Sequence, residues 1–124
     1  MSSTLTTRTV VLVVEDEPLL RIDAVDMVED AGYEAVQAGN SAQAIEALET
    51  RDDIRIVISD IHMPPGMDGI SFVSLARERW PHLHIVLVSG NVDRAEVSLP
   101  QGGVFFSKPY RQSDLMRALG RLAA

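Results

Sequence analysis

The sequence predicts one α/β domain in which five parallel strands alternate with five helices. Two observations lead to this fold class. First, four apolar runs rich in Val and Ile are typical of strands that are buried on both faces of a parallel sheet. Second, the segments between the runs are short and carry apolar residues at helical spacing. The runs cover residues 10–14, 56–59, 85–88 and 104–107, and a further strand is expected at 34–38.

The first two predicted helices have recognisable ends. Pro18 is expected at the first helical position, where its missing N–H costs nothing, and Gly32 ends that helix. The second helix follows an N-cap signal at Gly39-Asn40-Ser41. Helical spacing predicts that the inward faces of these helices carry Leu20, Ala24, Met27, Val28, Ala31, Ala44, Ile45 and Leu48.

The second half of the chain is less regular. A third helix is expected over residues 70–80, because Pro81 ends it. Residues 91–103 have only a weak helical pattern and include a proline, so this fourth helix is expected to be shortened. The last helix is expected to be capped by Ser113. Its inward face is predicted to carry Leu115, Leu119 and Leu122.

The composition limits the possible functions. The chain has 124 residues, which suits a single domain with its own core. Its formal net charge of -7 argues against nucleic-acid binding, because phosphate backbones require a basic face. The absence of cysteine excludes disulfides, thiolate metal sites and a cysteine nucleophile.

No membrane or export segment is expected. No apolar stretch reaches the roughly 20 residues that a membrane span needs. Residues 1–8 lack the apolar segment of a signal peptide and are expected to form a flexible tail. The domain is therefore expected over residues 9–124, and a cytoplasmic location follows by default.

Each of the four apolar runs stops at a polar residue that can take part in chemistry. The first run ends at Glu15 and Asp16, and the second ends at Asp60. The third ends at Ser89, and the fourth ends at Lys108, the only lysine in the chain. Because parallel strands all point the same way, these side chains are expected to gather at one edge of the sheet. A doubly wound sheet of order 2-1-3-4-5 also has its switch point between the strands that carry Asp16 and Asp60.

This group of side chains fits the chemistry of a divalent cation and a phosphate. Three carboxylates beside one ammonium leave about two negative charges uncompensated, which favours uptake of a cation or a proton. Carboxylate and water oxygens suit Mg²⁺ or Mn²⁺. The ammonium of Lys108 can pair with a phosphate, and the Ser89 hydroxyl could hydrogen-bond it. An aspartate is an acceptable nucleophile for phosphoryl transfer.

Each residue also has a simpler interpretation when it is taken alone. Acids such as Glu15 and Asp16 are favoured at helix N-termini, and an aspartate after a strand is usually a turn residue. Their joint occurrence at successive strand ends favours a site. His82 and His84 alternate near another strand, and a surface or packing role is preferred to a metal pair because no further ligands lie nearby in the sequence.

Over residues 9–124 the chain resembles the receiver domain of bacterial two-component response regulators. The matching segments are Val13-Val14-Glu15-Asp16-Glu17-Pro18, Asp60-Ile61-His62-Met63-Pro64, Met67-Asp68-Gly69, Ser89-Gly90 and Lys108-Pro109-Tyr110. Each segment alone is a weak match, whereas the ordered set is specific. The resemblance implies a flavodoxin-like receiver fold. A stand-alone, single-domain type is expected, with a receiver cut from a hybrid kinase as the alternative.

The resemblance implies a phosphoacceptor and its metal ligands. Asp60 would accept a phosphoryl group from a phosphohistidine on a sensor histidine kinase or a histidine phosphotransfer protein. Asp16, Asp60 and the backbone carbonyl of His62 would ligate Mg²⁺, with Glu15 acting mostly through water. The protein would then catalyse only its own phosphorylation and dephosphorylation, and would not be an enzyme acting on other substrates.

The resemblance also implies a switch and a docking surface. Ser89 would follow the phosphoryl group, Lys108 would pair with it, and Phe105 would occupy the position of the family's aromatic rotamer switch. Phe105 lacks the hydroxyl of the tyrosine often found there, so it would act through packing alone. An apolar docking patch for the kinase would comprise Leu19, Leu20, Ile22, Pro109 and Tyr110. Core packing explains Leu20 equally well.

Three functions remain open from the sequence. The leading hypothesis is a phosphorylatable switch that signals through an unknown protein partner or relays phosphate onward. A Mg²⁺-dependent phosphohydrolase with an aspartyl-phosphate intermediate is disfavoured, because His62 and not a second acid lies two residues after Asp60. A receiver-like binding module that is never phosphorylated is disfavoured by the complete acidic set.

Overall fold

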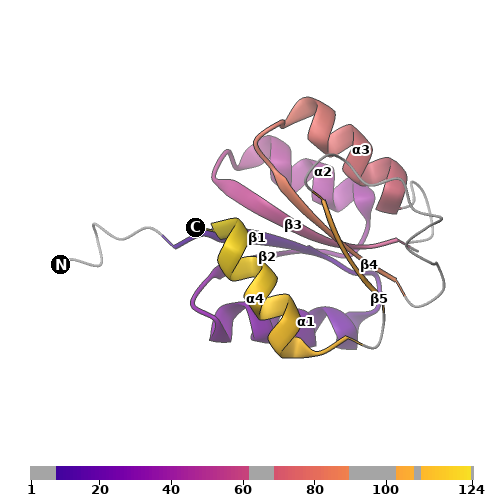
Figure 1. Cartoon of the computed structure of the whole chain (residues 1–124). Coiled ribbons are helices and arrows are strands. Elements are labelled where there is room, and N and C mark those ends of the chain that lie inside the picture. Colours follow the sequence, from indigo (N-terminus) through magenta and orange to yellow (C-terminus); the bar gives the residue numbers. More distant parts are fainter. Residues whose placement is uncertain (1–7, 62–68, 90–102, 108–109, 124) are drawn as a thin grey trace.

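The computed structural model of the chain describes residues 8–61, 69–89, 103–107 and 110–123. Within these ranges five strands and four helices form three layers, with the sheet in the middle (Figure 1). The strands are β1 (Val10–Val14), β2 (Glu34–Ala38), β3 (Ile54–Asp60), β4 (His84–Ser89) and β5 (Val104–Ser107). The helices are α1 (Pro18–Asp30), α2 (Ser41–Thr50), α3 (Gly69–Arg79) and α4 (Gln112–Ala123).

The sheet is parallel throughout and has the order β2-β1-β3-β4-β5, which confirms the predicted topology. β1 and β3 are neighbours, and Val14 lies opposite Ser59 at their carboxyl ends. β3 also pairs with β4, where Asp60 lies opposite Val88. The residues that follow β1 and β3 therefore leave the sheet side by side.

Within the described ranges each face of the sheet is covered by two helices, and alternate residues of a strand point to opposite faces. On one face Leu12 and Ile85 belong to a buried cluster with residues of α2 and α3, including Phe72. On the other face Val13 and Val86 belong to a second cluster, with residues of α1 and α4. Figure 1 shows the same arrangement, with α2 and α3 on one side of the sheet and α1 and α4 on the other.

The predicted burial of the strands is confirmed for three of the four apolar runs. β1 is buried at every position, and β3 and β4 are buried over most of their length. The expectation is wrong for β5, which is only half-buried and ends at the exposed Ser107. The reason is topological, since β5 is the last strand of the sheet and only β4 pairs with it.

Most of the predicted helix ends are confirmed. Pro18 is the first residue of α1, and Gly32 after its end has a φ of 96°, a conformation that glycine adopts without a Cβ clash. Asn40 is the N-cap of α2, and its side chain accepts a hydrogen bond from the Gln43 N–H. The third helix lies one residue earlier than expected, from Gly69 to Arg79.

The last helix corrects one prediction. Ser113 is not its cap, because α4 already begins at Gln112. The backbone N–H groups of Asp114 and Leu115 both donate to the carbonyl of Arg111, so the chain turns into the helix before Ser113. Leu115 and Leu119 are buried as predicted, and Leu122 is partly buried. The shortened helix predicted over residues 91–103 falls almost entirely outside the described residues.

Helix α1 places some of its apolar side chains in water. Met27 and Val28 are buried as expected, but Leu20 is 49% exposed, so its predicted place in the core is wrong. Leu20 lies in the first turn of α1 and lines a cavity beside the helix, so its side chain stays accessible to solvent. None of the helices within the described ranges combines the length and hydrophobicity that crossing a membrane would require.

Gly69, the first residue of α3, lies against the backbone that carries Asp60. A Cβ at Gly69 would overlap the Asp60 carbonyl oxygen and lie 2.7 Å from the Ile61 Cα. The Gly69 N–H also donates to the Ile61 carbonyl at 2.7 Å. Only a glycine allows this approach, and the approach holds the backbone of Asp60 and Ile61 against the start of α3.

We therefore expect Gly69→Ala to lower the free energy of unfolding by about 1–3 kcal/mol, as overpacking against backbone does. Thermal and urea unfolding would measure the change. Gly120→Ala is the matched control, because a Cβ at that helical position meets nothing within 4 Å. The control is expected to stabilise α4 by roughly 0.5–1 kcal/mol. Equal stability of the Gly69→Ala and wild-type proteins would contradict the close approach.

Candidate metal and phosphoryl site

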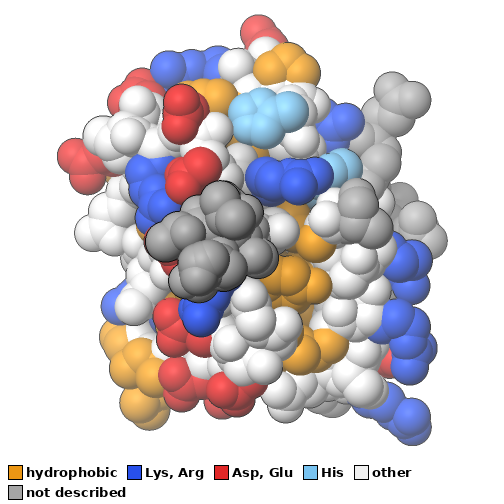
Figure 2. All heavy atoms as spheres, turned by 90° about the vertical axis from the view of Figure 1, so that its left-hand side faces the viewer, with side chains coloured by type: hydrophobic (Ala, Val, Ile, Leu, Met, Phe, Trp, Pro, Cys, Tyr) orange, Lys and Arg blue, Asp and Glu red, His pale blue; other side chains and the backbone are white. Residues whose placement is uncertain are grey.

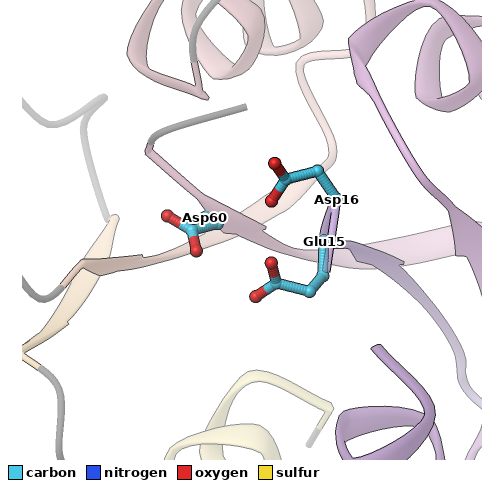
Figure 3. Close-up of side chains that lie close together, drawn as sticks. All are labelled: Glu15, Asp16 and Asp60. Carbon is cyan, nitrogen blue, oxygen red and sulfur yellow. The ribbon is translucent and has the colours of Figure 1, made fainter. Parts of the chain in front are cut away.

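Three carboxylates meet at the carboxyl edge of the sheet. Glu15 and Asp16 follow β1, Asp60 ends β3, and one oxygen from each lies within 4.8 Å of the others. Figure 3 shows the three carboxylate groups turned toward a common space. This is the only group of three such ligands among the described residues that could hold a metal ion. The predicted convergence of these acids is confirmed.

The backbone holds Glu15 from two sides. Its N–H donates to the Ala38 carbonyl at 3.0 Å, which continues the pairing of β1 with β2. Its carboxylate accepts the N–H of Glu17 at 3.2 Å. The side chain of Glu15 is buried, whereas Asp16 is half-buried and reaches the opening of the site. These hydrogen bonds therefore hold the turn between β1 and α1 in place at Glu15 and Asp16.

Asp60 is held by its neighbours in the sheet. The hydroxyl of Ser59, which is fully buried, donates to the Asp60 backbone carbonyl at 3.0 Å. The N–H of Ile61 donates to the Val88 carbonyl at 3.1 Å, so β3 stays paired with β4 up to the site. The Asp60 side chain itself is half-buried, which leaves it accessible from solvent.

The donor set fits a small, hard cation. Carboxylate oxygens alone, at a site that is open to water, are the ligands that Mg²⁺ and Mn²⁺ take, and both ions keep several waters. The described residues contribute no cysteine and no histidine to this group, which argues against zinc. Glu15, Asp16 and Asp60 could therefore hold a divalent cation and leave room for an oxygen ligand.

A cavity of about 610 Å³ opens beside the acids, between α1 and α4. Glu15, Asp60 and Val88 are among the residues that line it. Leu20 and Tyr110 line it as well, which brings together two of the five residues of the predicted docking patch. Leu19 and Ile22 are 76% and 52% exposed on the same helix, as a docking surface requires.

The predicted switch residues occupy neighbouring strands. Ser89 is fully buried at the end of β4, one residue beyond the Val88 that pairs with Asp60. Phe105 in β5 lies opposite Leu87 and packs against the cluster on the α2 and α3 side. Because side chains alternate along a strand, Ser89, Leu87 and Phe105 share one face of the sheet. Ser89 and Phe105 therefore lie on the same side of the sheet, on neighbouring strands.

Three predicted site residues fall outside the described residues. They are His62, Lys108 and Pro109. Their roles stay predictions from the resemblance. Tyr110, which is described, is partly buried, and its ring lies 5.8 Å from that of Phe106 in a tilted arrangement.

The histidines near β4 do not form a metal site with any third ligand in the described part of the chain. The ring of His82 lies 3.3 Å from the Ile54 carbonyl, and burial together with Arg55, Arg77 and His82 lowers the pKa of His84. Figure 2 shows histidine side chains at the surface beside basic side chains. The packing role that the sequence favoured is thus the better interpretation.

Two residues beside the site have structural roles that the sequence reasoning did not predict. Arg21 donates from its guanidinium to the Glu15 backbone carbonyl at 2.9 Å. The guanidinium also lies against Gly39, in the turn between β2 and α2. A signal was present in the sequence, since Arg21 is the only basic residue in an otherwise acidic helix.

The chain matches the family model of the response regulator receiver domain over residues 11–120. It is 39% identical over 116 residues to the response regulator protein FleR of Pseudomonas aeruginosa, covering 91% of this chain but only 24% of FleR. It is 30% identical over 115 residues to the response regulator receiver protein CpdR of Brucella abortus, covering 90% of this chain and 94% of CpdR.

Solved structures agree with these similarities. The crystal structure of a response regulator receiver protein from Sinorhizobium medicae matches with a TM-score of 0.84 and 29% identity, covering 93% of this chain and 94% of that one. The agreement extends over the whole sheet and confirms the flavodoxin-like receiver fold. On its sequence, its strand order and its acidic cluster, the chain belongs to the response regulator receiver domain family.

Proposed function

We propose that this chain is a phosphorylatable receiver in which Asp60 carries the phosphoryl group. The observation that supports this most strongly is the convergence of Glu15, Asp16 and Asp60 within 4.8 Å at the switch point of the sheet. Asp60 projects from a strand whose backbone is paired on both sides, so its carboxylate has a defined position. Its half-exposed side chain can be reached by a phosphoryl donor.

The proposed reaction moves one phosphoryl group between two side chains. A carboxylate oxygen of Asp60 attacks the phosphorus of a phosphohistidine on a sensor histidine kinase or histidine phosphotransfer protein. The P–N bond breaks, the imidazole keeps the bonding pair and takes up a proton, and an acyl phosphate forms on Asp60. Water later cleaves that acyl phosphate and restores the carboxylate, so the chain acts only on its own phosphoryl group and is not an enzyme for other substrates.

We assign the divalent cation to Asp16 and Asp60, with Glu15 beside them and the backbone carbonyl of His62 as a further ligand suggested by the family. A bound Mg²⁺ or Mn²⁺ would neutralise charge on the equatorial phosphoryl oxygens. Asp16 is the more accessible of the two acids of the β1–α1 turn, and Glu15 is the buried one. The family resemblance is what suggests direct ligation by Asp16 and contact through water by Glu15.

We further propose that Ser89, Lys108 and Phe105 convert phosphorylation into a change of shape. The Ser89 hydroxyl would hydrogen-bond a phosphoryl oxygen, and the Lys108 ammonium would pair with another. Phe105 shares a face of the sheet with Ser89 and is only half-buried, so it has room to change its packing. A Ser89→Ala protein that still changes its hydrogen exchange fully on addition of beryllofluoride would contradict this role.

The kinase is proposed to dock on α1 and the groove beside it. Leu19, Leu20 and Ile22 are large apolar side chains that are about half or more exposed, and Tyr110 lines the same groove as Leu20. Since Glu15 and Asp60 line the same groove as Leu20 and Tyr110, a partner seated there could bring its phosphohistidine to Asp60. The downstream partner is a protein, and the cytoplasm is the proposed location.

Replacing Asp60 should have opposite effects on the free energy of unfolding in the absence and in the presence of Mg²⁺. In EDTA, Asp60→Asn should raise the free energy of unfolding, because it relieves repulsion among the three carboxylates. With Mg²⁺ at 100 times its dissociation constant, the wild-type protein should gain about 2.7 kcal/mol, and Asp60→Asn should gain far less. Thermal unfolding with and without Mg²⁺ measures both effects.

Asp52→Asn is the control for this measurement, because Asp52 is an exposed acid outside the acidic cluster. It should respond to Mg²⁺ as the wild-type protein does. If Asp60→Asn gains as much stability from Mg²⁺ as the wild-type protein, the ion binds elsewhere.

Phosphorylation should occur at a single side chain. With acetyl phosphate and Mg²⁺, the wild-type protein should gain one hydroxylamine-sensitive phosphoryl group, and Asp60→Asn should gain none. Intact-protein mass spectrometry measures the labelling, with Asp52→Asn as the control that labels normally. Sustained turnover of phosphomonoesters would favour the phosphohydrolase. Ion binding without labelling would favour a binding module that is never phosphorylated.

Substitutions in the docking surface should slow phosphotransfer from the kinase without changing the ability of Asp60 to react with a small phosphoryl donor. Leu19→Gln with Ile22→Gln should slow phosphotransfer from a cognate sensor kinase by about 10-fold or more, as the loss of buried apolar contacts predicts. The kinase would be found by phosphotransfer profiling against the sensor kinases of the source organism. Labelling by acetyl phosphate should stay at the wild-type rate, because that donor needs no docking surface. Unchanged transfer from the kinase would exclude α1 as the docking site.

A further inference from the structure

Arg21 occupies a position in α1 that helix electrostatics does not favour. It follows the first turn, near the positive end of the helix dipole, where acidic side chains are the stabilising ones. The acids of α1 lie later in the helix instead, at Asp23, Asp26, Glu29 and Asp30. A residue that departs from a local preference in this way often serves a site. The observed contacts of Arg21 show which one.

The guanidinium of Arg21 bonds to the turn that carries the acids. Its Nη1 donates to the Glu15 backbone carbonyl at 2.9 Å. That carbonyl and the N–H of Asp16 belong to one planar peptide unit. Fixing the carbonyl therefore fixes the plane from which the Asp16 side chain starts. With the Glu15 N–H bonded to Ala38, both ends of Glu15 are held.

Gly39 leaves the space through which the guanidinium passes. A Cβ at Gly39 would lie 2.9 Å from Arg21 Nη1 and 3.8 Å from its Cζ. Among the described glycines only Gly32 has a positive φ, so the backbone conformation at Gly39 does not itself require glycine. A Cβ there would instead have to displace the end of the flexible Arg21 side chain. The turn is also held still, since the Gly39 N–H donates to Gln43 Oε1 at 2.6 Å.

We propose that Arg21 is a positioning residue for the cation and phosphoryl site, and that Gly39 is the glycine that admits it. Arg21 holds the Glu15–Asp16 peptide so that the Asp16 carboxylate converges with that of Asp60. This inference rests on the proposed function and adds residues that do not themselves touch the ion or the phosphoryl group. It joins three segments into one support, namely the β1–α1 turn, α1 and the β2–α2 turn.

A positioning role and a purely electrostatic role of Arg21 predict opposite changes in cation affinity when Arg21 is removed. A guanidinium near the carboxylates weakens cation binding by electrostatic repulsion, so removing a purely electrostatic Arg21 would tighten it. Removing a positioning Arg21 would weaken it. Gly39→Ala separates the two further, because it keeps the positive charge while its Cβ displaces the guanidinium from the Glu15 carbonyl. The same Cβ would lie 3.2 Å from Gln43 Oε1, which calls for a control at Gln43.

The test measures Mg²⁺ and Mn²⁺ affinity by isothermal titration calorimetry for Arg21→Met, Gly39→Ala and the double variant. Each single variant should bind about 10-fold more weakly, as the loss of an outer support of a metal ligand does. The double variant should be no weaker than the weaker single, because both changes break the same hydrogen bond. Tighter binding by Arg21→Met with no change in Gly39→Ala would overturn the proposal.

Three controls isolate the contact. Arg79→Met removes an exposed arginine that pairs with Glu49, and Gly120→Ala adds a methyl group in open space. Gln43→Ala removes the other side chain that Gly39 contacts. All three should bind Mg²⁺ as the wild-type protein does. Weakened binding in Gln43→Ala equal to that in Gly39→Ala would assign the effect to the α2 cap and overturn the role of Arg21.

Failure of this inference differs from failure of the proposed function. If the wild-type protein binds Mg²⁺ and labels at Asp60 while both single variants match it, only the role of Arg21 is wrong. If the wild-type protein binds no Mg²⁺, the proposed function fails together with it. Should Arg21→Met not fold, Gly39→Ala still decides the question, because its added methyl group meets only the ends of flexible side chains.

Discussion

The close approach of three like charges is the constraint on which the rest of this structure depends. Glu15, Asp16 and Asp60 each place an oxygen within 4.8 Å of the others. Two unit charges about 5 Å apart repel by about 3 kcal/mol at an effective dielectric of about 20, and water at the opening reduces that value. The chain must supply enough rigidity to hold the acids in place when no cation offsets the repulsion.

The rigidity comes from the sheet and from the turns that leave it. β1 is buried at every position, and β3 is paired with β1 and β4, so neither strand can shift without losing core contacts. Beyond the strands, the Glu15 backbone is bonded at both its N–H and its carbonyl, and Gly69 presses on the backbone of Asp60. The core thus supports the site directly. A mutation in the core, like one in the site, is expected to change the positions of the three carboxylates.

Predictions that depend on residues close together in the chain were more accurate than those that depend on contacts between distant segments. Strand identity, Pro18 at the start of α1 and the Asn40 cap depend on residues that are neighbours in the chain, and all three are confirmed. The order of the strands follows from handedness rules and is also confirmed. Ser113 as a cap was wrong because Arg111 accepts the first helical bonds, and Leu20 was misplaced because helical periodicity does not reveal that a cavity lies beside the helix.

By itself the sequence determined that this chain is a parallel α/β domain with acids at the carboxyl ends of its strands, because hydrophobic runs and the residues that stop them are local features. It also determined the family, since the ordered motifs are a property of the sequence. Only the tertiary structure decided that Arg21 reaches Glu15 across Gly39, and that Leu19, Leu20 and Ile22 face solvent beside the groove. These are contacts and exposures between segments that meet only after the chain has folded, so no local pattern specifies them.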